Sequence, residues 1–143
     1  MTREKYMEKA IQVETKVGFI EGRDAIHLDK IESNGIDWEF VGEFCGDLVT
    51  NNISKSEWIP YKLTFKSVQN LFSCDIECEP TAIVSWEEAD DDMSVFHFIE
   101  NSKFLSNIPI RSEINRNDLK HYWLQTYDIA FHIIAKNYDL ELL

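Results

Sequence analysis

Two of the three cysteines stand close together, in the stretch Cys74-Asp-Ile-Glu-Cys78. Thiolates bind zinc, and carboxylates such as those at positions 75 and 77 can assist them. A structural zinc site usually takes four ligands from paired short-spaced elements, and the sequence holds no second pair. In a strand, positions 74, 76 and 78 would share one face, which predicts small buried apolar groups rather than a metal site. We expect no metal and no cofactor.

Four histidines lie mostly far apart along the chain: His27, His97, His121 and His132. If the last segment is a hairpin that turns at Tyr127-Asp128, His121 faces Ile134 and His132 faces Trp123. The two histidines are then predicted not to be partners, and no metal triad follows. A histidine on an apolar strand is typical of a hydrogen-bonded core or rim residue.

Aromatic residues make up 13% of the chain. Aromatic side chains dominate burial in protein cores, so core packing is the simplest interpretation. The alternative is a concave ligand pocket on a curved sheet, since such pockets are mostly apolar with a few polar groups. Tyrosines would supply those groups. The candidate ligand or partner contacts in this set are Tyr61, Trp86, Tyr122, Trp123, Tyr127 and His121.

The segment 87–92, EEADDD, holds five acids in six residues. Calcium loops place oxygen ligands at alternate positions with a glycine turn and a closing glutamate, and this run lacks both the spacing and the glycine. A solvated loop is the simplest interpretation. The functional alternative is a docking surface for a basic partner, with Asp90, Asp91 and Asp92 as contacts.

Sequence motifs of common enzymes are missing. The chain has no GxSxG, no glycine-rich phosphate loop, no HExxH, and no cysteine with a nearby histidine. Active sites also assemble from distant residues, so this absence weakens the case for an enzyme without excluding one.

The chain carries 26 acidic and 14 basic residues, which gives a formal net charge of −12. Binding to DNA, RNA or anionic lipid needs Lys and Arg to replace counterions, so we expect neither nucleic acid nor membrane as a partner. The charge suits a basic protein partner attracted over long range, and it equally suits a surface that is charged for solubility.

Three features predict a cytoplasmic protein with reduced thiols. The first residues include no apolar signal segment. No apolar run approaches the roughly 20 residues of a membrane helix. The three cysteines are an odd and small set, whereas a secreted domain more often shows an even framework.

Alternation of apolar and polar residues is the strongest structural pattern. In WEFVGEFCGDL, Trp38, Phe40, Phe44 and Leu48 share one face, with glycines at 42 and 46 between them. This predicts a half-buried strand, and the glycines indicate strong curvature or the close approach of another backbone. Further strands are predicted in AIHLDKI (25–31), joined through Asn34-Gly35, and in YKLTF (61–65), VQNLFSCDIEC (68–78), TAIVSW (81–86) and SVFHFIE (94–100).

The segment 120–142 fits two structures. As a helix, it places Leu124, Tyr127, Phe131 and Ile134 on one stripe, whereas as strands it splits into HYWLQT and IAFHIIA. Aromatic and β-branched residues favour strands, and the absence of Gly or Pro at the turn counts against them. Other helices are expected at 3–10 and around NSKFLSNI (101–108), where Asn101 or Ser102 could cap a short turn.

The chain is therefore predicted to be mainly β (α+β) and a single domain over residues 1–143. The expected architecture is a curved antiparallel sheet, a sandwich or a partly closed barrel, with a short N-terminal helix and minor helical turns. An open sheet edge can pair with a second copy, so a homo-oligomer is compatible with this architecture.

Three segments resemble a known group of proteins: WIPYKLTFKSVQNLFSCDIE, FIENSKFLSNI and HYWLQTYDIAFHIIAKNYDLEL. Their blocks YKLTFKSV, IENSKFL and HYWLQTYDIAFHIIA look like the recurring blocks of a family of small uncharacterised bacterial proteins. The resemblance implies strands in the last segment. It implies no activity and no catalytic residue, because no activity is associated with that family.

Two functional hypotheses follow. The first is a non-enzymatic binding protein that acts on a basic protein partner through its acidic surface, as an immunity protein or antagonist does. The second is a small-molecule binder or minor enzyme with an aromatic-walled pocket on the curved sheet. Acids clustered around exposed aromatic residues would favour the first, and Tyr and His converging in a closed apolar cavity would favour the second.

Overall fold

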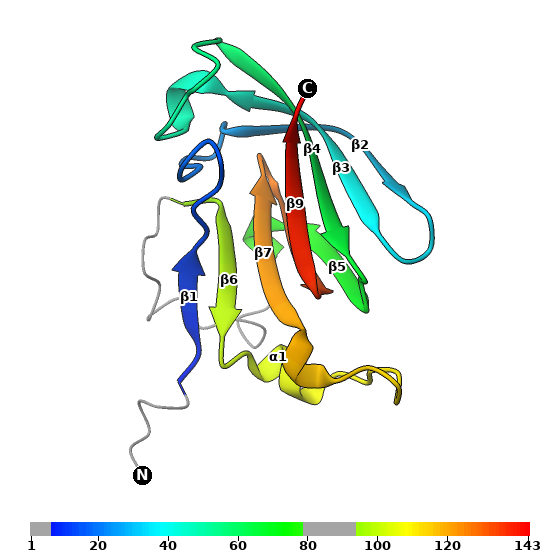
Figure 1. Ribbon diagram of the computed structural model, residues 1–143. Helices are drawn as coiled ribbons and strands as arrows, with labels where there is room; N and C mark the ends of the chain where they lie inside the picture. The colour runs from blue at the N-terminus through cyan, green and yellow to red at the C-terminus, as the bar shows by residue number, and fades with distance from the viewer. Residues whose placement is uncertain (1–6, 79–93) are drawn as a thin grey trace.

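The computed structural model describes residues 7–78 and 94–143. This part of the chain is mainly β and forms two antiparallel sheets in a sandwich-like arrangement, not a closed barrel (Figure 1). The five-stranded sheet has the order β1-β6-β7-β8-β5, and the four-stranded sheet has the order β2-β3-β4-β9. The strands are β1 (Lys9–Gln12), β2 (Ile26–Ser33), β3 (Trp38–Cys45), β4 (Trp58–Lys66), β5 (Asn70–Asp75), β6 (Phe96–Glu100), β7 (Lys120–Thr126), β8 (Ile129–Ala135) and β9 (Asn137–Leu142).

The predicted hairpin between β2 and β3 is confirmed. Its turn begins at Asn34, whose side-chain oxygen accepts hydrogen bonds from the backbone N–H groups of Ile36 and Asp37 at 2.9 and 2.8 Å. Gly35 has a φ of +93°, a conformation that glycine adopts at low cost. The Asn-Gly pair therefore specifies this turn, as the sequence indicated.

The two sheets are joined at a corner where two strand pairs pass from one sheet to the other. Strand β4 leads into β5, and β8 leads into β9, while β4 pairs with β9 and β5 pairs with β8. Backbone hydrogen bonds continue through the corner, from Lys136 N to Lys66 O at 2.9 Å and from Gln69 N to Ile134 O at 2.8 Å. The corner keeps the backbone paired while the chain changes sheet.

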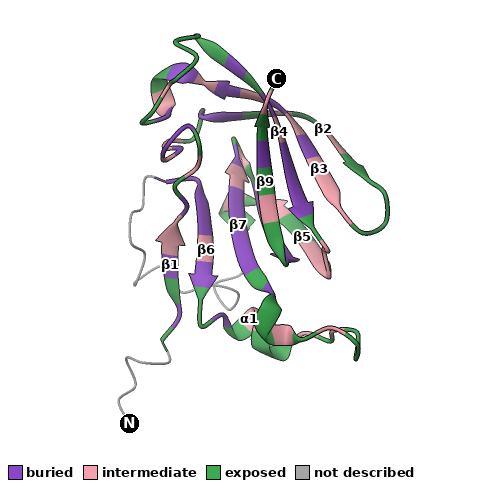
Figure 2. Cartoon of the chain, in the orientation of Figure 1, coloured by how far each residue is buried: buried purple, intermediate pink, exposed green. Residues whose placement is uncertain are grey.

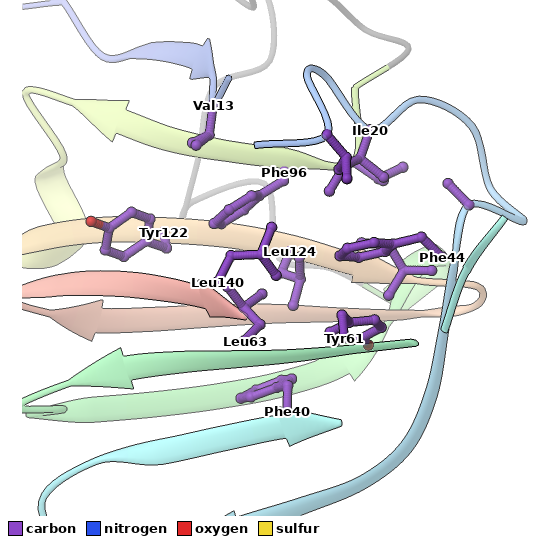
Figure 3. Packing of buried hydrophobic residues seen from close by; sticks show 14 of the residues in the cluster. Val13, Ile20, Phe40, Phe44, Tyr61, Leu63, Phe96, Tyr122, Leu124 and Leu140 are labelled. Carbon is purple, nitrogen blue, oxygen red and sulfur yellow. The ribbon is translucent and has the colours of Figure 1, made fainter. Parts of the chain in front are cut away.

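Aromatic side chains fill the space between the sheets (Figure 3). Phe65 is fully buried, and its ring centroid lies 5.4 Å from Phe40, 5.3 Å from Tyr122 and 6.1 Å from Phe96. Edge and tilted contacts of this kind add to the burial of apolar area. Core packing is therefore the role of most of the aromatic set.

Gly42 allows β2 and β3 to lie unusually close together. A Cβ atom at this position would stand 1.8 Å from the carbonyl oxygen of His27. The Tyr61 hydroxyl, which comes from β4 on the other side of β3, donates to the same oxygen at 3.2 Å. The close backbone approach predicted from the glycines is confirmed here. The strand predicted over 38–48 is too long, because β3 ends at Cys45 and Gly46–Leu48 form the 3-10 helix η2, which places Leu48 outside the strand.

The segment 120–142 is a strand pair followed by a third strand, and the helical alternative is wrong. Strands β7 and β8 pair in the predicted register, with His121 opposite Ile134 and Trp123 opposite His132. Their turn is formed by Tyr127 and Asp128, and Tyr127 has a φ of +59°. The turn thus forms without glycine, in a backbone region that non-glycine residues seldom adopt.

The short N-terminal helix predicted at 3–10 is not supported. Residues Lys9–Gln12 form β1, which pairs with β6, and residues 1–6 lie outside the described part of the chain. Pairing with β6 buries Ala10 completely, and this tertiary gain outweighs the local preference for a helix. In the described part of the chain the α-helix is α1 (Lys103–Asn107), where Ser102 is the N-cap as the sequence suggested. None of the helices described here is long and apolar enough to cross a membrane.

The strand predicted through Cys78 ends early. Strand β5 stops at Asp75, whose carboxylate accepts a hydrogen bond from Glu77 N at 2.9 Å, and Ile76–Cys78 form the 3-10 helix η3. Cys74 is half-buried but Cys78 is exposed, so the prediction that both are buried is wrong for Cys78. The strand predicted at 81–86 lies outside the described residues.

Candidate functional site

Two histidines and a serine form a buried hydrogen-bonded chain on the outer face of the five-stranded sheet. The hydroxyl oxygen of Ser102 lies 2.7 Å from Nδ1 of His121, and Nε2 of His121 lies 2.9 Å from Nδ1 of His132. All three side chains are buried. We call these residues the Ser-His-His chain.

The prediction that His121 and His132 are not partners is therefore wrong, although the predicted register is right. His132 stands opposite Trp123, which lies two residues along β7 from His121. Residues offset by two positions on neighbouring strands share a face, and long side chains reach across that diagonal. The imidazole rings meet in this way, with centroids 5.1 Å apart.

The hydrogen bonds of Ser102 determine which atoms donate and which accept along the Ser-His-His chain. Its oxygen accepts from the backbone N–H of Leu105 at 3.0 Å, as an N-cap does. Its own proton then goes to His121 Nδ1, since a buried hydroxyl needs an acceptor. His121 is therefore neutral with its proton on Nε2, which donates to His132 Nδ1.

The surroundings of the chain keep His121 neutral. Burial and, to a smaller extent, the charge of a protonated His132 together lower the pKa of His121 to about 3. The ring of Phe104, from α1, lies 5.4 Å from the His121 ring and 6.5 Å from the His132 ring. No acid among the described residues bonds to His121, so its positive form has no counter-charge there.

A serine next to a histidine is also the arrangement of a nucleophile and its base. Here Ser102 is only 4% exposed, and its oxygen is already engaged by the helix cap. Attack on a substrate needs an accessible hydroxyl, so this geometry fits a structural role. The described residues also contain no group of three His, Cys, Asp or Glu side chains that could hold a metal ion.

A second feature lies at the turn of the same β7–β8 hairpin and is exposed. Tyr127 is 49% exposed at the tip of the β7–β8 hairpin, and Ile129 beside it is also exposed. The guanidinium of Arg23 lies 4.4 Å from the centre of the Tyr127 ring and forms an ion pair with Asp128. This ion pair raises the pKa of Arg23, first through the hydrogen bond and then through the charge of Asp128.

An apolar pocket of about 420 Å³ opens beside Tyr127, between β2 and the β7–β8 hairpin. His27 lines the pocket, and its ring makes an edge contact with Trp58 at 4.9 Å. Trp58 is 42% exposed. The pocket is lined by Ile26, His27, Leu28, Thr126, Tyr127, Ile129 and Phe131. We call Arg23, His27, Trp58, Tyr127 and Ile129 the aromatic patch.

Several acidic residues are neighbours of the aromatic patch in the strand register or in the sequence. Glu43 lies opposite His27 in the β2–β3 register, and Glu57 precedes Trp58. In the sequence, Asp24 follows Arg23 and Asp128 follows Tyr127, while Asp29 is two residues from His27. Acids near exposed aromatic residues are the feature expected of a protein-binding surface under the first of the two functional hypotheses.

The outer face of the four-stranded sheet is also acidic. It carries a polar groove of about 360 Å³, in which Lys62 pairs with Glu141 at 3.4 Å and Lys66 pairs with Asp37 at 3.6 Å. The charged lining is Glu32, Asp37, Glu39, Asp139, Glu141, Lys62 and Lys66. Acids outnumber lysines in this groove, so its charge is negative.

The structure does not bring the predicted contacts together. Tyr61 and Tyr122 lie in the core, where burial raises the pKa of both phenols, that of Tyr122 to about 12. His121 and Trp123 lie on the opposite face of the five-stranded sheet, and Tyr127 is at the hairpin tip. The predicted candidates Tyr61, Tyr122, Tyr127 and His121 therefore do not converge in one cavity, and the histidine that lines the pocket beside Tyr127 is His27. Trp86, Asp90, Asp91 and Asp92 lie outside the described residues.

The patch residues that the sequence did not flag are Arg23, His27, Trp58 and Ile129. Arg23 and Asp128 are 105 residues apart in the chain, so no local pattern links them. For Trp58 a signal existed in the sequence. It begins an alternating strand, so its side chain points to the face opposite that of its neighbour Ile59, which is a core residue.

The chain matches no protein-family model, no curated protein and no solved structure. The resemblance to a family of small uncharacterised bacterial proteins therefore stays a prediction.

Proposed function

We propose that the protein binds a basic protein partner through the aromatic patch. The observation that carries this proposal is the exposure of Tyr127 beside an apolar pocket, with the exposed Trp58 in contact with the pocket-lining residue His27. Trp, Tyr and Arg are the residue types that most often dominate binding energy at interfaces, and the patch contains all three.

Each part of the patch has a separate task in this proposal. The pocket of about 420 Å³ receives an apolar side chain of the partner, which excludes water from the centre of the interface. Trp58 and Tyr127 flank that side chain. The acids around the patch and the negative groove attract a basic surface over long range and speed the encounter. An immunity protein or antagonist is the sharpest form of this function.

The proposal is tested by capture from the native cell extract with matched variants. The wild-type protein, Trp58→Ala and Tyr127→Asn are compared with the control Ile36→Ser. Ile36 is an exposed apolar residue in the β2–β3 turn, outside the patch. Asn is chosen for position 127 because it tolerates the positive φ.

A partner that supports the proposal is captured by the wild type and by Ile36→Ser, and is lost from both patch variants. The purified pair should also bind more weakly as salt rises from about 50 to about 300 mM, because screening weakens the attraction. The proposal is contradicted if both patch variants retain the partner. It is also contradicted if the wild type captures no partner at about 50 mM or at about 300 mM salt.

The pocket supports a second candidate function, the binding of a small apolar molecule. Its volume of about 420 Å³ lies within the range of known ligand sites. Trp58 contacts His27 in the pocket wall, so a bound ligand should change the tryptophan fluorescence. Titration with apolar fluorescent probes tests this candidate, and a response that survives Trp58→Phe and Tyr127→Asn would place the probe elsewhere.

A further inference from the structure

Helix α1 is docked on the five-stranded sheet without being part of the core. None of its residues is buried, and it is drawn as exposed or intermediate along its length (Figure 2). Phe104 lies against His121 of β7 and His132 of β8, and the Arg116 guanidinium donates to the backbone oxygens of Leu105 and Ile108 at the end of the helix. The helix therefore depends on a few specific bonds for its position.

Two side chains hold the first turn of α1. The Ser102 oxygen accepts from Leu105 N at 3.0 Å, and the Glu8 carboxylate, from the segment before β1, accepts from Lys103 N at 3.0 Å. Ser102 is itself held by His121, which His132 holds in turn. Phe104 covers both imidazole rings. The position of α1 is thus coupled to the protonation state of the Ser-His-His chain.

In the Ser-His-His chain, neither Nδ1 atom can take up a proton without the loss of a hydrogen bond. A proton on His121 Nδ1 would turn the acceptor of the Ser102 hydroxyl into a donor. A proton on His132 Nδ1 would set two N–H groups against each other across 2.9 Å. Either event breaks one bond of the chain and buries a positive charge.

Within residues 7–78 and 94–143, no ionisable group other than His132 bonds to His121, so none compensates that charge there. Glu8 is bonded to α1, and Lys120 of β7 lies over the Phe98 ring at 5.1 Å. The groups concerned are Glu8 before β1, His97 in β6, Lys103 in α1, Arg116, which donates to the last carbonyls of α1, Lys120 in β7, and Cys74 and Asp75 in β5.

We propose that Ser102, His121 and His132 form an acid-sensitive latch, which holds α1 against β7 near neutral pH and releases it on acidification while the two sheets stay folded. The sheets survive because the core lies on the other face of β7 and β8, where Tyr122, Leu124 and Ile133 contact the four-stranded sheet. Release of α1 exposes none of these residues.

The expected pH dependence follows from the two states of His121. Burial lowers its pKa from the ordinary 6.5 to about 3 in the latched state, whereas a released, solvated ring titrates at its ordinary value. The released state therefore binds more protons between these values. Each pH unit below 6.5 should raise the ratio of released to latched protein about tenfold.

Hydrogen exchange measured by NMR tests the latch, with protection corrected for the intrinsic rate at each pH. From about pH 7.5 to about pH 4.5, the protection of the Leu105 amide should begin to fall near pH 6.5 and then drop about tenfold per pH unit. The protection of Leu63 in the core strand β4 should change much less. Equal loss at both amides, or no loss at Leu105, overturns the proposal.

Three variants identify the sensor. Ser102→Ala should lose Leu105 protection already at neutral pH and keep the protection of Leu63. His121→Asn, which retains an acceptor near Ser102, should give Leu105 protection that no longer depends on pH. Glu8→Gln should keep the pH dependence. A dependence that persists in His121→Asn and disappears in Glu8→Gln would assign the effect to the carboxylate and overturn the latch.

Discussion

The two faces of the β7–β8 hairpin are both buried, but they are buried in different ways. The inner face carries Tyr122, Leu124 and Phe131, which join the aromatic core between the sheets. The outer face carries His121 and His132. Burial of these two imidazole rings requires that the rings stay neutral and that their nitrogens be hydrogen-bonded. One hairpin therefore combines a face that depends on apolar area with a face that depends on proton positions.

The difference shows how one small domain can combine a core whose stability does not depend on acidification with an outer helix whose position does. The titrating group among the inner residues named above is the Tyr122 phenol, whose pKa burial raises to about 12, so acidification leaves the inner face unchanged. The outer face positions α1 through hydrogen bonds that a single proton disrupts. Four substitutions test this comparison, and they are ordered by the size of their expected effect on stability.

The largest effect is expected from Phe65→Ala, which empties the centre of the core. Phe65 contacts Phe40, Phe96 and Tyr122 and is fully buried. Loss of such a ring should lower the free energy of unfolding by about 3–5 kcal/mol at every pH. Urea unfolding followed by far-UV circular dichroism measures it. If the loss of unfolding free energy in Phe65→Ala changed with pH as much as the loss in His121→Asn, the two faces of the hairpin would not differ in pH dependence.

The second effect is a change in the pH dependence of stability in His121→Asn. In the wild type, the unfolded state binds more protons than the folded state between pH 6.5 and about 3, because burial lowers the pKa of His121. Stability therefore rises with pH, and acidification removes about 1.4 kcal/mol per pH unit until the latch opens. The stability difference between wild type and variant should shrink as the pH falls. If the free energies of unfolding of wild type and variant changed with pH in parallel, the assignment of this pH dependence to His121 would be contradicted.

Ser102→Ala should have a smaller effect, about 1 kcal/mol near neutral pH, because it removes one N-cap and one bond to His121. The loss should be local to α1. Differential scanning calorimetry gives the global change and hydrogen exchange gives its location. A cost as large as that of Phe65→Ala would show that the core depends on the outer face.

The smallest effect on stability is expected from Tyr127→Asn at the hairpin tip, which belongs to neither buried face. The ring is half exposed and contacts Arg23, so its loss should cost at most about 0.5–1 kcal/mol. Binding of the partner should nevertheless weaken by more than about 1 kcal/mol. Urea unfolding and isothermal titration calorimetry measure the two quantities. Unchanged affinity would remove Tyr127 from the proposed interface.

Much of the hairpin could be predicted from the sequence, because alternation and a two-residue turn determine which residues are opposite each other. The pairs His121 with Ile134 and Trp123 with His132 follow directly from a turn at Tyr127-Asp128. The contact between the two histidines required a further step. Diagonal neighbours on one face are within reach of imidazole rings, so residues that are not opposite each other can still bond.

Other features could not be predicted, because distant parts of the chain determine them. The segment at Lys9–Gln12 looks helical locally, but it becomes a strand because β6 offers it an edge. The patch joins Arg23, Trp58 and Tyr127 from three separated segments. Ser102 could be predicted as a cap from its place before α1, whereas its bond to His121 depends on how α1 docks.

The most direct test of the account is the protonation state of His121, read from the nitrogen chemical shifts of the two ring nitrogens by NMR. The account predicts a neutral ring near pH 7 with its proton on Nε2 and with Nδ1 accepting from Ser102. In the latched species, the ring should remain neutral well below its ordinary pKa of 6.5. A ring that titrates near 6.5 while α1 remains docked, or one that carries its proton on Nδ1, would contradict it.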